Sequence, residues 1–197
     1  MPTPEEFIRA QLQESCRVKQ AFTAELLAAI AALAGRIVRT VHDGGKIILF
    51  GNGGSAADAQ HIAAEFVVRL REHRRPMAAL ALTVNTSVLT AAANDYGYEQ
   101  VFARQVEALA RAGDVLIALS TSGESANVLR AAEAGRAKGV WVAALTGESG
   151  GSLRERADLL VNVPSKDAQR IQEAHITIGH ILCALVEQQV RTGTPRG

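Results

Sequence analysis

The sequence predicts an α/β fold built on one five-stranded parallel sheet that is flanked by helices. Five short apolar runs recur after residue 46, stretches with helical periodicity separate them, and Gly, Pro, Ser or Asp bound each run. Strands that alternate with helices in this way pair as a parallel sheet whose two faces are covered. The length of 197 residues suits a single domain.

Two helices are expected before the first strand. One covers about residues 5–19, and a longer one, from Glu25 to His42, places apolar side chains every three or four positions along one face. No strand-helix-strand unit requires these helices. We therefore expect residues 1–44 to form a helical segment that packs on the core and on other subunits, and residues 45–197 to form the α/β domain.

The five strands are expected at residues 47–50, 78–82, 115–119, 140–145 and 159–163. A last helix is expected from about Ala168 to Arg191, with Pro164 before it and Gly193 after it as boundary signals. In open parallel sheets, ligands bind beyond the carboxyl ends of the strands. The loops that follow the first and third strands are therefore candidates for a binding site.

Composition and charge favour a small-molecule ligand. Charged residues make up 21% of the chain and the formal net charge is +1, which gives no electrostatic footprint for nucleic acid or an anionic membrane. The amino end has no basic segment followed by an apolar run, and no window reaches the roughly 18 apolar residues of a membrane span. We expect a cytoplasmic protein in which Cys16 and Cys183, far apart in the sequence, are reduced structural thiols rather than a disulfide or part of a zinc site.

The first loop (residues 51–56) follows the first strand and reads GNGGSA. Its glycines let the backbone turn sharply and approach a ligand, and the helix that follows offers hydrogen-bond donors at its N-terminus. The spacing also fits the dinucleotide-binding pattern G-x-G-x-x-A, which needs an acidic residue after the second strand. The chain has Thr83, Val84 and Asn85 there and thus no acidic residue, which argues against a nicotinamide-binding site.

The second loop (residues 120–125) follows the third strand and reads STSGES. Four hydroxyl groups at the start of a helix expected near Asn127 suit a phosphate. Ser and Thr in this position also commonly cap helices, and for either loop alone the two interpretations are balanced. Two such loops at two strand ends favour a phosphorylated ligand.

Residues 147–151 read GESGG and match the hydrolase pattern G-x-S-x-G. Two glycines follow the serine and no long helix comes after it, which argues against the strained nucleophile turn of a hydrolase.

Polar side chains on two expected helices are candidates for chemistry. His61 and Glu65 are four positions apart and share one helical face, although a solvated stripe with an ion pair between Glu65 and Arg69 is the structural alternative. His180 lies among apolar residues, where a single histidine is more often a hydrogen-bonded core residue than a catalyst. Gln172 lies eight positions earlier, about 80° around an ideal helix, so both residues can line the same side.

Together these motifs resemble the SIS (sugar isomerase) family, and within it the sedoheptulose-7-phosphate isomerases. The likeness rests on GNGGSAADAQH at residues 51–61 with Glu65, STSGxS at residues 120–125, and RIQE at residues 170–173 with His180, and it covers essentially the whole chain. One local departure is Glu124, where many relatives are expected to have a neutral residue. A carboxylate beside a phosphate loop repels the ligand unless it turns outward, so Glu124 puts affinity in doubt rather than reaction type.

The resemblance implies an isomerase that converts sedoheptulose 7-phosphate to D-glycero-D-manno-heptose 7-phosphate, in heptose biosynthesis for lipopolysaccharide or capsule. It implies a homotetramer and one Zn²⁺ per subunit, with Glu65 and His180 as the acid/base pair. The implied zinc ligands are His61, Glu65, Gln172 and His180. The implied substrate contacts are Asn52, Gly53, Gly54, Ser55, Glu65, Asn94, Asp95, Ser120, Thr121, Ser122, Ser125 and Gln172.

Such a ketose-to-aldose conversion needs a proton moved between adjacent carbons through an enediol, while protons on the sugar oxygens are exchanged. We assign the transfer of the carbon-bound proton to Glu65 and the transfer of the oxygen protons to His180. A zinc ion would polarise the carbonyl, either in place of this pair or in addition to it. The main alternative is a non-catalytic SIS module that binds a sugar phosphate or the replication initiator. That branch of the family lacks the equivalents of Glu65 and His180. A Rossmann oxidoreductase is the third candidate.

Overall fold

An all-parallel sheet forms the centre of the protein in the computed structural model, which describes residues 1–192. Its five strands are β1 (Ile47–Gly51), β2 (Ala79–Ala81), β3 (Val115–Leu119), β4 (Trp141–Thr146) and β5 (Leu159–Asn162). Their order in the sheet is β2-β1-β3-β4-β5. The predicted five-stranded parallel sheet is confirmed, and each strand begins and ends within one residue of its expected bounds.

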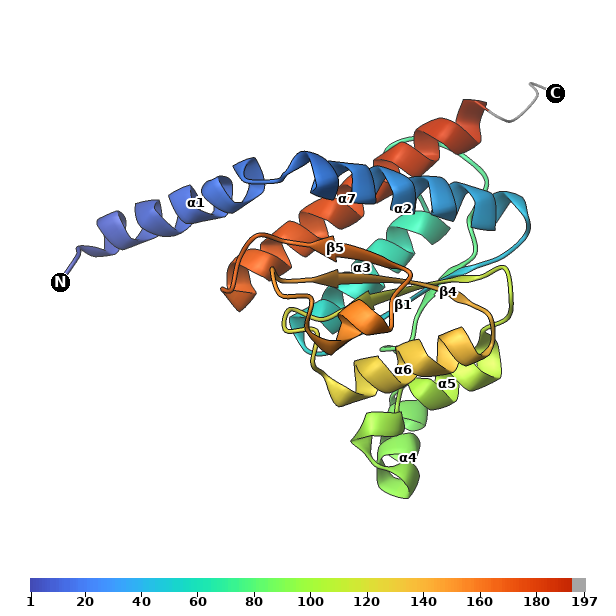
Figure 1. Cartoon of the computed structure of the whole chain (residues 1–197). Coiled ribbons are helices and arrows are strands. Elements are labelled where there is room, and N and C mark those ends of the chain that lie inside the picture. Colours follow the sequence, from blue (N-terminus) through green and yellow to red (C-terminus); the bar gives the residue numbers. More distant parts are fainter. Residues whose placement is uncertain (193–197) are drawn as a thin grey trace.

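Helices cover both faces of the sheet (Figure 1). They are α1 (Pro4–Gln20), α2 (Ala24–His42), α3 (Gly54–Val67), α4 (Thr86–Tyr96), α5 (Ala103–Leu109), α6 (Ala126–Ala137) and α7 (Ala168–Thr192), with short 3-10 helices η1 (Tyr98–Gln100) and η2 (Gly151–Glu155). The expected N-terminal helices and the expected last helix are all present. Gly193, the expected stop signal of the last helix, lies outside the described residues.

The strands distribute their side chains between two hydrophobic clusters. In β1, Ile47 and Leu49 pack with residues of α2, α3 and α7, whereas Ile48 and Phe50 pack with residues of α5 and α6. All four side chains are fully buried, as expected for a strand covered on both faces. This alternation places α3 and α7 together on one side of the sheet.

The helices α3 and α7 approach each other closely at one point. A Cβ atom added at Gly179 of α7 would lie 2.5 Å from Cδ1 of Ile62 on α3, so the glycine makes room for that side chain. Because interiors are close-packed, this contact holds the two helices in one relative position. As shown below, these helices carry the candidate catalytic residues.

At the amino end, α1 begins with a capping box that the sequence TPEE provides. The Thr3 side chain accepts a hydrogen bond from the Glu6 amide at 3.2 Å, and the Glu6 carboxylate accepts one from the Thr3 amide at 2.7 Å. The first turns of α1 project beyond the rest of the molecule (Figure 1). Among residues 1–192 no single helix has the length and apolar composition to cross a membrane, and α1 with α2 would do so only as a pair bent by 76°.

Candidate active site

The first and second loops leave neighbouring strands at the point where the strand order reverses. From β1 the chain passes to β2 on one side, and then returns to β3 on the other side. In parallel sheets this switch point opens a crevice beyond the carboxyl ends of the two strands. The first loop follows β1 and the second follows β3, so the sheet brings both candidate loops to this crevice.

Two glycines of the first loop are approached closely by other parts of the chain. A Cβ atom at Gly51 would lie 2.7 Å from the Leu119 carbonyl oxygen and 2.8 Å from Cβ of Ser55. A Cβ atom at Gly54 would lie 2.5 Å from the carboxamide of Gln172, which reaches the first loop from α7. Gly53, the residue before α3, has a positive φ of 56°, which favours glycine. The structure thus brings Gln172 to the first loop.

The hydroxyl groups of the second loop are arranged around its own backbone. The Ser120 hydroxyl accepts a hydrogen bond from the Gly123 amide at 3.1 Å and lies 3.4 Å from the Ser125 hydroxyl. Ser125 is the N-cap residue of α6, yet its side chain makes no capping hydrogen bond. The capping interpretation of this serine is therefore wrong, and its hydroxyl is available to a ligand at the helix N-terminus.

A pair of side-chain amides connects the two loops. Asn52 of the first loop and Asn127 in the first turn of α6 donate to each other's side-chain oxygens, each at 2.8 Å. The Tyr98 hydroxyl also donates to the Asn52 oxygen, at 3.2 Å. Asn127 and Tyr98 were not among the expected site residues. Asn127 could have been found from the sequence, because it lies two positions after Ser125. No local pattern indicates Tyr98.

The exposed Glu124 side chain is held by η2. Its two carboxylate oxygens accept hydrogen bonds from the Ser152 amide at 2.8 Å and the Ser152 hydroxyl at 2.6 Å. These two bonds hold the pKa of Glu124 below its ordinary value, and the bond from the hydroxyl has the larger effect. The carboxylate is therefore charged and directed at Ser152. Beyond residues 147–151 the chain enters only this short 3-10 helix, which agrees with the argument against a hydrolase turn.

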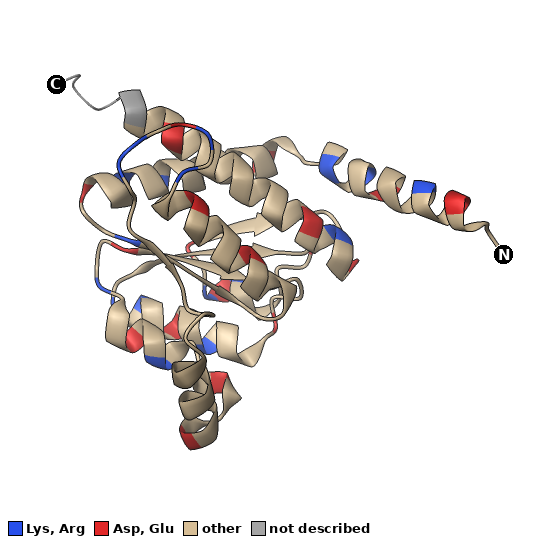
Figure 2. Cartoon of the chain, turned by 180° about the vertical axis from the view of Figure 1, so that it is seen from behind, with Lys and Arg blue, Asp and Glu red and all other residues tan. Residues whose placement is uncertain are grey.

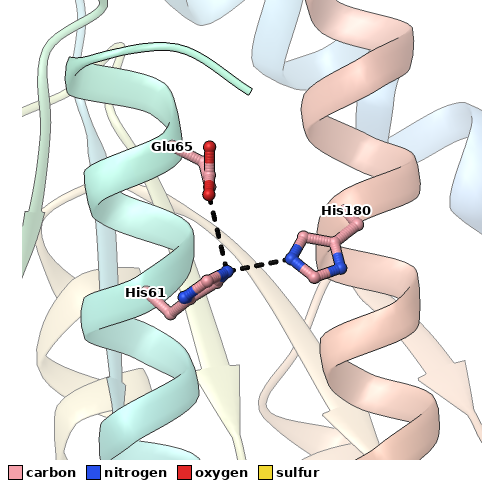
Figure 3. Close-up of side chains that lie close together, drawn as sticks. All are labelled: His61, Glu65 and His180. Atoms are coloured by element: carbon pink, nitrogen blue, oxygen red, sulfur yellow. Dashed lines mark hydrogen bonds and ion pairs between the residues drawn. The ribbon is translucent and has the colours of Figure 1, made fainter. Parts of the chain in front are cut away.

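His61, Glu65 and His180 form one cluster between α3 and α7 (Figure 3). Nε2 of His61 lies 2.9 Å from Nε2 of His180 and 3.5 Å from Oε1 of Glu65. The ring centroids of the histidines are 5.0 Å apart, with the ring planes at 72°. The expected shared face of His61 and Glu65 is confirmed, and Glu65 pairs with His61 rather than with Arg69. His180 is half-buried and faces His61, so it is no core residue.

The atoms of this cluster suit a metal ion. One ligand atom from each of the three residues lies within 4.8 Å of the others, and His nitrogen and Glu oxygen are ordinary zinc ligands.

Asp58 lies one turn before His61 on α3 and its Oδ2 atom is buried without a hydrogen-bond partner. Burial raises the pKa of Asp58, and the charge of His61 opposes this effect.

Asn94 and Asp95 lie on α4, where the Asn94 amide donates to the Asp95 carboxylate at 2.8 Å. Both are exposed, and Asp95 borders a largely apolar groove of about 880 Å³. Residues of α3, β2, α4 and α5 line this groove. Within one chain, neither residue joins the cluster of His61, Glu65 and His180.

Comparison with known proteins gives concordant matches. Residues 12–147 match the family model described as "SIS domain". The phosphoheptose isomerase of Roseiflexus sp. (strain RS-1) is 53% identical over 178 residues, which are 90% of each chain. That of Aquifex aeolicus (strain VF5) is 51% identical over 94% of this chain and 97% of its own length. The structure of phosphoheptose isomerase GmhA from Neisseria gonorrhoeae superposes with a TM-score of 0.89 at 44% identity, covering 94% of this chain and 100% of that one.

Proposed function

The chain belongs to the SIS-domain family and within it to the phosphoheptose isomerases, and on this premise we propose that it converts sedoheptulose 7-phosphate to D-glycero-D-manno-heptose 7-phosphate. The observation that carries the proposed mechanism is the cluster at the contact of α3 and α7. There a carboxylate and two imidazoles converge within 4.8 Å of one another. An acid/base reaction on a sugar needs such a pair of groups of different type.

We assign the proton on carbon to Glu65. In the forward direction its carboxylate takes a proton from C1 of the ketose, and the electron pair of that bond forms the C1–C2 double bond of the enediol. The carbonyl oxygen on C2 gains a proton at the same time. Glu65 then returns the proton to C2, and the C1 hydroxyl loses its proton as the aldehyde forms. The Glu65 side chain is 21% exposed, so it is both reachable and partly shielded from water.

We assign the oxygen protons to His180, whose ring faces the same space from α7 (Figure 3). An imidazole can both donate and accept a proton, which suits transfer between the O1 and O2 atoms of the sugar. His61 lies between the two, at 2.9 Å from His180 and 3.5 Å from Glu65, and orients both.

We assign the phosphate of the substrate to the second loop. Ser120, Thr121, Ser122 and Ser125 offer hydroxyl groups at the N-terminus of α6, where the helix dipole favours an anion. Support comes from Ser125, whose hydroxyl makes no capping bond. The remaining contacts to the sugar are assigned to residues of the first loop, α4 and α7: Asn52, Gly53, Gly54, Ser55, Asn94, Asp95 and Gln172.

We assign one Zn²⁺ per subunit to His61, Glu65 and His180, with Gln172 as a fourth ligand. The donor set supports this, because imidazole and carboxylate are ordinary zinc ligands, whereas an amide oxygen is a weak one. When bound, the ion would polarise the carbonyl of the sugar.

We further propose a cytoplasmic homotetramer that supplies heptose for lipopolysaccharide or capsule. Two apolar surfaces support assembly: Phe7, Ile8 and Leu12 are exposed on α1, and the groove beside β2 is largely apolar. In this proposal residues 1–44 are the helical segment that contacts other subunits, and residues 45–197 are the SIS domain. Neither nucleic acid nor a membrane is a partner.

The direct test is to incubate the purified protein with sedoheptulose 7-phosphate, without a nicotinamide, and to analyse the sugar products. Formation of the heptose phosphate is the expected result. Binding without product would instead make the chain a non-catalytic SIS module.

A further inference from the structure

We propose that the buried ion pair between Arg74 and Glu187 holds Glu65 in its position relative to His180. Arg74 and Glu187 are then positioning residues for proton transfer. The inference rests on the proposed roles of Glu65 and His180. Neither Arg74 nor Glu187 belongs to the cluster itself. Both act through the backbone of α3 and through α7.

Arg74 is bonded directly to the last turn of α3. Its Nη2 atom donates to the backbone oxygen of Glu65 at 2.7 Å, and its Nη1 atom donates to that of Phe66 at 2.8 Å. The last carbonyl groups of a helix have no partners within the helix, so this guanidinium satisfies two of them. The backbone of the proposed base is therefore held by Arg74.

Glu187 anchors Arg74 to α7. The Nε atom of Arg74 donates to Oε1 of Glu187 at 3.1 Å, and the two side chains are only 3% and 2% exposed. On an ideal helix, Glu187 follows His180 by about two turns and lies on nearly the same face. The pair therefore connects the end of α3 that carries Glu65 to the face of α7 that carries His180.

The same carboxylate also holds the basic loop between α3 and β2, which lies against the carboxyl-terminal part of α7 (Figure 2). Glu187 accepts backbone amide hydrogen bonds from Leu70 at 2.8 Å, Arg71 at 3.1 Å and Glu72 at 3.3 Å. Burial alone would raise the pKa of Glu187, but these amides and Arg74 bring it below its ordinary value. The carboxylate thus stays charged at neutral pH.

Between the two ends of this connection lies Cys183. Burial first, and then the charges of Glu65 and Glu187, raise the pKa of its thiol to about 12. The charge of Arg74 acts in the opposite direction, so Cys183 is within electrostatic reach of Glu65 and of both members of the ion pair.

A gain in stability alone does not explain such a pair. Removing two charges from water costs several kcal/mol, and well-packed apolar residues often serve stability equally well. What an apolar pair cannot supply is the fork of donors that fixes the Glu65 carbonyl. A shift of about 1 Å at a reacting group lowers turnover by roughly a hundredfold, so this connection matters for rate.

The test compares two conservative variants with a matched control. Arg74→Lys keeps the positive charge but has a single nitrogen in place of the planar fork, whose three nitrogens bond Glu187, Phe66 and Glu65 separately. Glu187→Gln keeps the volume and removes the charge. The control is Asp114→Asn: Asp114 is also a buried carboxylate, pairs with Lys46 and accepts backbone amides, but it lies before β3 at the amino edge of the sheet.

Turnover and KM are measured per folded molecule, with the folded fraction taken from circular dichroism at the assay temperature. Both variants should lose about tenfold or more in kcat with KM nearly unchanged, because the phosphate loop is untouched. Asp114→Asn should lower the melting temperature and leave kcat at the wild-type value. Wild-type kcat in folded Arg74→Lys and Glu187→Gln would overturn the proposal and leave the pair a purely structural one.

Crystal structures of the wild type and of Glu187→Gln give a readout that needs no turnover. The distance between Nε2 of His61 and Nε2 of His180, 2.9 Å here, should increase in the variant, together with a displaced Glu65. An unchanged cluster would contradict the inference. If the wild type itself produces no heptose phosphate, the proposed function fails, while this comparison still decides whether the ion pair positions Glu65.

Discussion

Two histidines five positions apart on α7 have opposite environments. His180 is half-buried and contacts His61, whereas His175 is fully buried. Burial lowers the pKa of His175 to about 4, although its ring lies 3.3 Å from the Thr146 backbone oxygen, a contact that raises it. At neutral pH His175 is therefore an uncharged core residue. Residue type alone does not separate a catalyst from a packing residue; burial does.

At the level of single residues, the acid/base assignment predicts how three variants rank. Glu65→Gln and His180→Gln should each lose roughly 10²-fold or more in turnover without unfolding, because Gln cannot replace the proton-transferring group. His61→Gln should lose less, because His61 only orients the other two. If zinc is the working electrophile, His61→Gln would fall as far, and chelation would abolish activity that added zinc restores. Turnover is measured with and without chelator; wild-type rates for the first two variants would refute the mechanism.

Removal of single hydroxyls from the second loop tests the phosphate assignment. Ser122→Ala and Ser125→Ala should each weaken substrate binding by about 1 kcal/mol, the value of one net hydrogen bond. Calorimetric titration with the substrate measures the change, and Ser149→Ala, outside the loop, is the control. Unchanged affinity in both loop variants would remove the phosphate from this loop.

The buried His175 predicts a pH-dependent stability. The unfolded chain binds a proton at the ordinary pKa of 6.5 and the folded chain only near pH 4, so stability is lost as the pH falls from 6.5 to 4. At about 1.4 kcal/mol per pH unit, the loss over this range is about 3 kcal/mol. Urea unfolding between pH 7 and pH 4 measures it. His175→Gln should show a shallower pH dependence than the wild type; an equal slope would contradict the prediction.

At the scale of elements, the contact of α3 and α7 assembles the site. Each helix carries part of the cluster, and Gly179 lets them approach because it has no side chain beside Ile62. Gln172, near the start of the same α7, reaches the first loop at Gly54. A single helix therefore connects the cluster with the glycine-rich loop. Changes in the packing of α7 should affect both.

Overpacking this contact should separate the helices. Gly179→Ala places a methyl group 2.5 Å from Cδ1 of Ile62, and such strain costs about 1–3 kcal/mol. The better helix propensity of Ala, about 1 kcal/mol, offsets only part of this. We expect lower stability and lower kcat. Adding Ile62→Val, which removes Cδ1, should recover both in part; a stable, fully active Gly179→Ala protein would show that the close approach is not needed.

At the scale of the whole molecule, the single chain leaves apolar surface uncovered. The exposed Phe7, Ile8 and Leu12 lie on the projecting α1, and the groove between α3 and α4 is largely apolar. Such surfaces in a folded chain usually contact other chains. Asp95, which like Asn94 stands apart from the cluster within one chain, borders this groove from α4.

The assembly proposal predicts a tetramer that depends on α1. Replacing Phe7, Ile8 and Leu12 together by Ser should produce smaller species, because the apolar face of α1 is lost. Replacing the neighbouring Arg9 by Ser, a change on the same helix that leaves this face intact, is the control. Sedimentation velocity measures the size of each protein. A well-folded wild-type monomer at the working concentration would refute the proposal.

Much of the fold could be predicted because its signals are local. Gly, Pro, Ser and Asp mark the strand ends in the sequence itself, so the strand bounds agree with the structure within one residue. The long helices α2 and α7 follow from apolar residues at helical spacing. By contrast, the bounds of α4 and α5 could not be predicted. The helix α5 has only seven residues, and α4 buries only Ala92, so neither has a long apolar face that marks its ends.

The sequence by itself determined the parallel sheet, the two loops at its carboxyl edge and, through its motifs, the family. Only the tertiary structure decided which polar groups meet. His61 and His180 are 119 positions apart, Asn52 and Asn127 are 75 apart, and Arg74 and Glu187 are 113 apart. Periodicity gives the face on which a side chain lies, but not the neighbour that this face meets. That neighbour depends on how helices pack over the sheet, as the close approach of Gly179 to Ile62 shows.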